Sequence, residues 1–111
     1  MILRIAVHRV WHSQWEEWRS MQVIELDTDT HRVLNVYPFT EEPRNTEWWG
    51  GLVILSAVLP LEPNGGEGLD AYVRRAGLLK EEKLAECYAF YVTGFSIADR
   101  RFLPAGRIKR I

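Results

Sequence analysis

The histidines and acids near the start of the chain have a spacing that could bind a metal ion. His8, His12 and Glu16 follow one another at intervals of four, which on a helix would place three metal-ligating groups on one face. Residues 2–11, however, alternate between apolar and polar as in a strand, where four residues span about 13 Å. Because two histidines that far apart cannot share one ion, we expect no metal site there.

The other candidate acids, bases and nucleophiles lack the arrangement that catalysis requires. Adjacent acids such as Glu41 and Glu42 point to opposite faces of an extended chain, so their adjacency does not make a catalytic pair. Cys87 has no histidine in its own segment, and we expect a buried, unreactive thiol. We predict no catalytic residue and no cofactor. The alternative is a small hydrolase-like enzyme in which Glu41, Glu47 or a histidine acts as a base in a tryptophan-walled pocket.

Three tryptophans lie close together after the first apolar segment. Trp11, Trp15 and Trp18 are spaced by four and three residues, which is typical of one face of a helix. We expect a single amphipathic turn that buries these indoles against a sheet. A stacking platform for a sugar, a base or another flat ligand is the functional alternative.

The stretch TEEPRNTEWWGG at residues 40–51 shows no periodicity. Pro43 and the pair at 45–46 favour a chain reversal, and the two glycines let the backbone enter a buried strand. If the backbone at Trp48 and Trp49 is extended, one indole must point away from whatever the other covers. We therefore predict a contact surface rich in tryptophan. Its candidate residues are Trp15, Trp18, Glu41, Trp48 and Trp49.

The charges are distributed unevenly along the chain. All 15 acids lie in residues 1–99, while the last twelve residues hold five bases and no acid. These bases are Arg100, Arg101, Arg107, Lys109 and Arg110. A cationic tail could bind a polyanion, but we favour a last strand whose charges face water. Nucleic acid is not an expected partner, because the chain as a whole is not basic.

The apolar patterns predict the elements that position these residues. Strands are expected over 2–11, 21–27, 31–39, 51–61, 87–95 and 106–111, with a hairpin turn at 27–30 and an amphipathic helix over about 68–79. The predicted fold class is α+β, a mainly antiparallel sheet of five to six strands with one helix. The sheet is expected to form a curled sheet, a sandwich or a partial barrel.

Length and composition place these elements in one domain, residues 1–111. A single cysteine is typical of a reducing compartment, and the first residues are interrupted by Arg4 and His8, which excludes a signal peptide or membrane span there. We expect a cytoplasmic protein that does not contact a membrane.

The segments VIELDTDTHRVLNVYPF and GGLVILS, within residues 22–56, resemble the N-terminal β-sandwich segment of amidohydrolase-superfamily enzymes. The resemblance implies a β-rich fold. No His-x-His motif follows, so no catalytic residue of that family can be assigned here. The chain also resembles short bacterial proteins whose structures carry no assigned function.

These features together favour a non-catalytic binding or protein-interaction domain. Aromatic and arginine side chains supply most of the energy in protein contacts, and this chain is rich in both. The expected partner is another protein or a second copy of the chain, in a homodimer.

Overall fold

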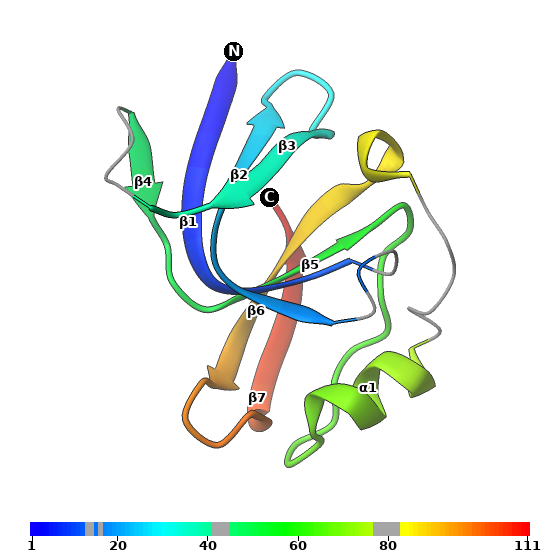
Figure 1. Ribbon diagram of the computed structural model, residues 1–111. Coiled ribbons are helices and arrows are strands. Elements are labelled where there is room, and N and C mark those ends of the chain that lie inside the picture. Colours follow the sequence, from blue (N-terminus) through cyan, green and yellow to red (C-terminus); the bar gives the residue numbers. More distant parts are fainter. Residues whose placement is uncertain (13–14, 16, 41–44, 77–82) are drawn as a thin grey trace.

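A computed structural model describes residues 1–12, 15, 17–40, 45–76 and 83–111 of the chain (Figure 1). The strands are β1 (Ile2–Trp11), β2 (Trp18–Asp27), β3 (Val33–Pro38), β4 (Thr46–Trp48), β5 (Leu52–Ser56), β6 (Tyr88–Ser96) and β7 (Arg101–Arg110). The helices are α1 (Leu69–Arg75) and a short 3₁₀ helix (Leu84–Glu86). No helix in this described part is both long and apolar enough to cross a membrane.

The described strands form one mixed, mostly antiparallel sheet. Its order is β3-β2-β1-β5-β6-β7, and β4 pairs with β1 outside this path. The predicted α+β class is confirmed. The predicted strand number of five to six is too low because β4 was missed: it is three residues long and pairs in parallel with Arg4–Ala6 of β1.

Strand β1 bends near its middle, as Figure 1 shows. The backbone N–H groups of His8 and Arg9 both donate to the carbonyl of Gly51, each at 3.1 Å. Across this bend the alternation of side chains shifts by one residue. As a result, Val7 and Val10 lie in one core cluster, while Trp11 lies in the other.

The sheet buries apolar side chains on both faces, and β5 contributes to both. Leu52 and Ile54 lie in the cluster under α1, whereas Val53 and Leu55 lie in the cluster enclosed by β1, β2 and β3. All five residues of β5 are buried, as the unbroken apolar run predicted. Central position in the sheet explains this burial, since β5 has β1 on one side and β6 on the other.

The curled sheet brings its β3 end close to the beginning of β6. Val33 N–H donates to the carbonyl of Cys87 at 3.0 Å, and Arg32 forms an isolated bridge with Tyr88. The sheet is not closed into a barrel. Cys87 is fully buried at this junction, as expected for an unreactive thiol.

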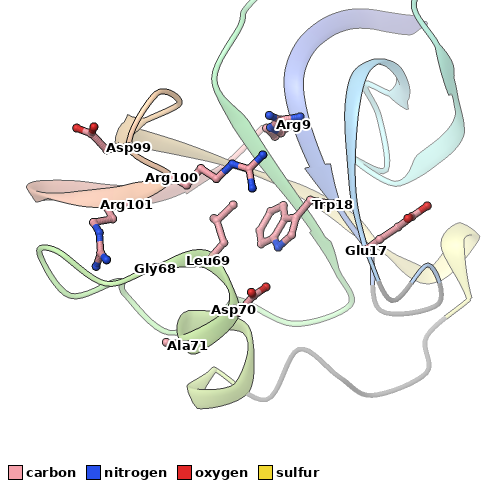
Figure 2. A pocket seen from close by; sticks show the side chains of 10 residues that line it. All are labelled: Arg9, Glu17, Trp18, Gly68, Leu69, Asp70, Ala71, Asp99, Arg100 and Arg101. Carbon is pink, nitrogen blue, oxygen red and sulfur yellow. The ribbon is translucent and has the colours of Figure 1, made fainter.

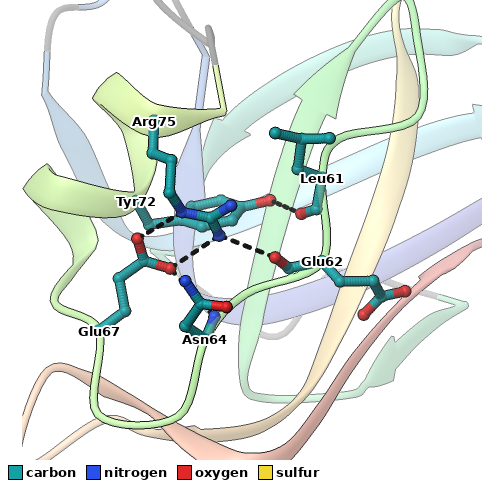
Figure 3. A network of polar contacts seen from close by, with 6 residues as sticks. All are labelled: Leu61, Glu62, Asn64, Glu67, Tyr72 and Arg75. Atoms are coloured by element: carbon teal, nitrogen blue, oxygen red, sulfur yellow. Dashed lines mark hydrogen bonds and ion pairs between the residues drawn. The ribbon is translucent and has the colours of Figure 1, made fainter.

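A polar network fixes the loop before α1 (Figure 3). The Arg75 guanidinium donates to both carboxylate oxygens of Glu67, at 2.8 and 2.9 Å, and also to the carbonyl of Glu62 at 2.8 Å. This guanidinium lowers the pKa of Glu67. The hydroxyl of Tyr72 donates to the carbonyl of Leu61 at 2.5 Å, and burial raises the pKa of Tyr72.

The same loop is also tied to β7. Gly66 N–H donates to the carbonyl of Phe102 at 2.6 Å, and Phe102 N–H donates to the carbonyl of Glu67 at 2.9 Å. The loop therefore holds α1 against the sheet. The predicted helix over about 68–79 is confirmed at Leu69–Arg75. Residues 77–79 lie outside the described residues.

The predicted helical stripe of Trp11, Trp15 and Trp18 is wrong. Trp11 ends β1 and Trp18 begins β2, and the two pair across the hairpin with ring centroids 4.9 Å apart. Trp15 lies in the connection and packs against the opposite core cluster. A short connection between antiparallel strands thus reproduces a helical spacing in the sequence.

Candidate functional site

Exposed aromatic side chains gather where β4 meets β1. We call this surface the aromatic corner and define it by His8, Phe39, Trp48, Trp49 and Tyr91. Trp48 is 52% exposed and Trp49 is 36% exposed, which is high for side chains of this size. His8 lies on β1, Phe39 follows β3, Trp48 ends β4, Trp49 follows it, and Tyr91 lies on β6.

The backbone of the aromatic corner is fixed by hydrogen bonds to β1. The N–H groups of Trp49 and Gly50 both donate to the carbonyl of Ala6, at 2.9 and 3.1 Å. Gly51 N–H donates to Nδ1 of His8 at 2.9 Å, so this ring nitrogen acts as an acceptor. Gly50 and Gly51 have φ values of 65° and 66°, a conformation that glycine adopts most readily.

The two adjacent indoles of the aromatic corner contact different neighbours. Trp48 packs edge-on against His8, with centroids 4.9 Å apart, and lies 6.2 Å from the Phe39 ring. Trp49 packs edge-on against Tyr91 at 5.4 Å, and its indole N–H donates to Glu47 at 2.9 Å. The Tyr91 hydroxyl donates to the Trp49 carbonyl at 3.0 Å. Both indoles are therefore held in place while part of each stays exposed.

A second feature is a cavity of about 550 Å³ beside α1 (Figure 2). We call it the arginine pocket. Three parts of the fold surround it: the beginning of α1, the paired end of β1 and beginning of β2, and the turn between β6 and β7. The residues that line it are Arg9, Glu17, Trp18, Gly68, Leu69, Asp70, Ala71, Asp99, Arg100 and Arg101. Within the described residues, none of its charged side chains forms an ion pair.

The predicted tryptophan contacts do not form a single surface. Trp48 and Trp49 are chain neighbours in the aromatic corner but contact different side chains, whereas Trp18 lines the arginine pocket. Trp15 is half-buried, and the Arg19 guanidinium lies 4.1 Å from its ring centroid. Glu41 lies outside the described residues.

The basic residues at the end of the chain are also dispersed. Arg100 and Arg101 line the arginine pocket. Arg107 and Lys109 pair with Thr93 and Tyr91 on one face of the β6–β7 ladder. Arg110 pairs with Phe90 and therefore points to the other face, where its guanidinium lies 5.6 Å from the Tyr88 ring. Because the five bases do not form one stripe, the geometry does not favour the polyanion alternative.

The three histidines lie in three separate environments. His8 contacts Trp48, the fully buried His12 ring lies 5.6 Å from the Trp15 ring, and His31 follows the β2–β3 turn. In residues 1–12, 15, 17–40, 45–76 and 83–111, no group of three His, Cys, Asp or Glu side chains could hold a metal ion. The hydrolase-like alternative therefore gains no convergent acid and base from the described residues.

Glu47 and His8 lie on different faces of the sheet. Glu47 pairs in register with Ile5, whose side chain belongs to the cluster enclosed by β1, β2 and β3. Trp48 pairs with Ala6 and points the opposite way, toward His8. The Oε2 atom of Glu47 accepts a hydrogen bond from the Trp49 indole N–H rather than from a histidine.

No protein-family model, curated protein or solved structure matches the chain. The resemblance to the amidohydrolase N-terminal segment stays a prediction. The aromatic corner and the arginine pocket are the two candidate sites.

Proposed function

We propose that this protein is a non-catalytic binding domain that contacts another polypeptide through the aromatic corner. The observation that carries the proposal is the half-exposed Trp48 indole beside the partly exposed Trp49, on a backbone fixed to β1. Tryptophan and tyrosine side chains held in one conformation are the residues that most often dominate protein contacts. We therefore assign the aromatic corner to recognition.

The rigidity of the aromatic corner supports binding. A side chain that is already ordered loses little conformational entropy when a partner covers it. Three polar groups of the aromatic corner already have hydrogen-bond partners: the Trp49 indole N–H, the Tyr91 hydroxyl and the His8 ring. A protein that covers the corner would therefore leave few polar groups without a hydrogen bond. The apolar ring surfaces would supply the free energy of association.

A second copy of the chain is the simplest polypeptide partner. Among the described strands β4 pairs with β1 alone, which leaves one short strand edge next to the exposed indoles. A symmetric dimer would use the same patch twice. We also propose that the domain works in the cytoplasm, because its only cysteine is buried and a reducing compartment suits such a chain.

Replacing Trp48 tests this assignment. Trp48→Ala should abolish any association that native mass spectrometry and light scattering detect for the wild type. Leu59→Ala is the matched control, since Leu59 is an exposed apolar side chain outside the aromatic corner. A wild-type assembly that Trp48→Ala leaves intact would contradict the assignment.

A further inference from the structure

We infer that the arginine pocket binds a small organic anion, a phosphate monoester or a carboxylate with a flat apolar part. This site is separate from the aromatic corner, and the inference does not depend on the proposed function. Three features carry it: guanidinium groups that form no ion pair with other described residues, an indole beside them, and a cavity of suitable size.

The guanidinium groups come from three places in the fold. Arg9 lies on β1, Arg101 begins β7, and Arg100 belongs to the turn between β6 and β7. Arg9 donates to the Ser20 hydroxyl and Arg101 donates to the Gly66 carbonyl at 2.8 Å, which leaves further donors on each. Figure 2 shows the Arg100 side chain extending over Leu69 toward Trp18. In Figure 2 the Arg9 and Arg100 guanidinium groups lie on the Trp18 side of the cavity, while the Arg101 side chain extends away from them. Two guanidinium groups on one side favour an anion that can accept several of their donors.

The acids that line the arginine pocket do not neutralise these arginines by contact. Asp99 accepts a hydrogen bond from the Ser96 hydroxyl at 3.3 Å, within its own turn. The Glu17 carboxylate points away from the arginines in Figure 2, and Asp70 lies near Trp18. Asp70 is therefore placed to accept a hydrogen bond from a hydroxyl or amino group of the same ligand.

Trp18 and Leu69 provide an apolar wall. The Trp18 ring packs on Trp11 at 4.9 Å, and its buried indole N–H has no hydrogen-bond partner among the described residues. Buried hydrogen-bond donors normally have an acceptor. The Trp18 indole N–H could therefore donate to an acceptor atom of a ligand. Leu69 is buried at the beginning of α1. A flat ring of a ligand could lie against this wall while its anionic group meets the arginines.

The size and rigidity of the arginine pocket suit such a ligand. Its volume of about 550 Å³ lies within the range of roughly 300–1,000 Å³ that small-molecule sites occupy. One wall is held by the network of Arg75, Glu67 and Tyr72, and by the bonds from the loop to Phe102. The site is thus largely formed before a ligand arrives, which lowers the entropic cost of binding.

Nuclear magnetic resonance titration tests the inference directly. The indole N–H signal of Trp18, assigned with Trp18→Phe, is followed while AMP, benzoate or inorganic phosphate is added. AMP tests a phosphate monoester and benzoate tests a carboxylate, and saturable movement of the signal with either one is the expected result. Inorganic phosphate should bind at least about tenfold more weakly than AMP if AMP is the probe that binds, because it cannot contact the apolar wall.

Arg100→Asn identifies the site. Asparagine tolerates the φ of 55° at this position, so the variant removes the guanidinium without straining the turn. We expect its dissociation constant to rise about tenfold or more, while Arg107→Gln, on the same hairpin outside the arginine pocket, changes little. Absence of saturable movement with both AMP and benzoate would overturn the inference, as would unchanged affinity in Arg100→Asn. Equal affinity for AMP and inorganic phosphate would contradict the role of Trp18 and Leu69.

Discussion

Gly51 is the residue on which the geometry of the aromatic corner most depends. Its φ is 66°, and a Cβ atom there would lie 2.8 Å from the Tyr91 hydroxyl. Gly51→Ala should therefore lower the free energy of unfolding by about 2 kcal/mol or more, since it adds a clash to the cost of a left-handed backbone. Urea denaturation measures this change.

Gly66→Ala is the matched control for that substitution. Gly66 also has a positive φ, 81°, but apart from its chain neighbours no atom of the described residues lies within 4 Å of the position its Cβ would take. Gly66→Ala should therefore lower the free energy of unfolding only by the cost of the left-handed backbone, about 1 kcal/mol. Equal losses in the two variants would mean that the contact between Gly51 and Tyr91 does not constrain the corner.

Glu67 makes stability depend on pH. Because Arg75 lowers its pKa below the ordinary 4.5, the ion pair stabilises the fold at neutral pH, and this contribution is lost as the pH falls through the lowered pKa. Glu67→Gln should cost about 1 kcal/mol at pH 7, a modest value because Arg75 is partly exposed. Thermal unfolding at pH 7 and at pH 3 should show the two proteins converging at the lower pH.

Glu62→Gln separates this effect from a general change in charge. Glu62 contributes its backbone carbonyl to the network, and its carboxylate points away in Figure 3. This variant should keep the stability of the wild type at both pH values. A difference between wild type and Glu67→Gln that persists undiminished at pH 3 would contradict the ion-pair explanation.

At the scale of elements, the attachment of α1 to its loop is open to a direct test. Tyr72 is fully buried, and its hydroxyl donates to the carbonyl of Leu61. Tyr72→Phe keeps the ring and removes this bond, so we expect a loss of about 1 kcal/mol in the free energy of unfolding. Tyr88→Phe, whose hydroxyl has no partner in the described residues, should be close to neutral. Comparable losses in both would show that the Tyr72 hydrogen bond does not hold the loop.

The elements with a clear period could be predicted from the sequence, and those without one could not. Alternation in residues 2–11 and the apolar run of β5 identify strands because burial on one or both faces dictates those patterns. Strand β4 has three residues and is defined by its parallel pairing with β1, which leaves no local pattern. The spacing of Trp11 and Trp18 is typical of a helix, but pairing of two antiparallel strands also places these residues side by side.

The candidate sites differ in the same way: one is formed by neighbours in the sequence and the other is not. Trp48, Trp49 and the two glycines are neighbours in the sequence, so an aromatic turn could be predicted there. The arginine pocket could not be predicted, because Arg9, Asp70 and Arg100 come from three distant segments. Only the sheet order, which places the end of β1 and the β6–β7 turn near α1, brings them together.

At the scale of the whole molecule, the aromatic corner and the arginine pocket use different parts of the sheet. The corner depends on β4, the middle of β1 and β6, and the pocket on the end of β1, α1 and β7. The two sites should therefore respond independently to substitution. Trp48→Ala should leave the AMP and benzoate titrations unchanged, and Arg100→Asn should leave any protein association unchanged.

The most direct test of the account is site-specific photo-cross-linking in the cells that make the protein. A photoreactive amino acid at position 48 should yield one discrete covalent adduct with a polypeptide, which mass spectrometry identifies as a second copy or another protein. The same amino acid at position 58, an exposed apolar position outside the aromatic corner, should not yield it. Absence of any adduct at position 48, or the same adducts at both positions, would contradict a binding role for the aromatic corner.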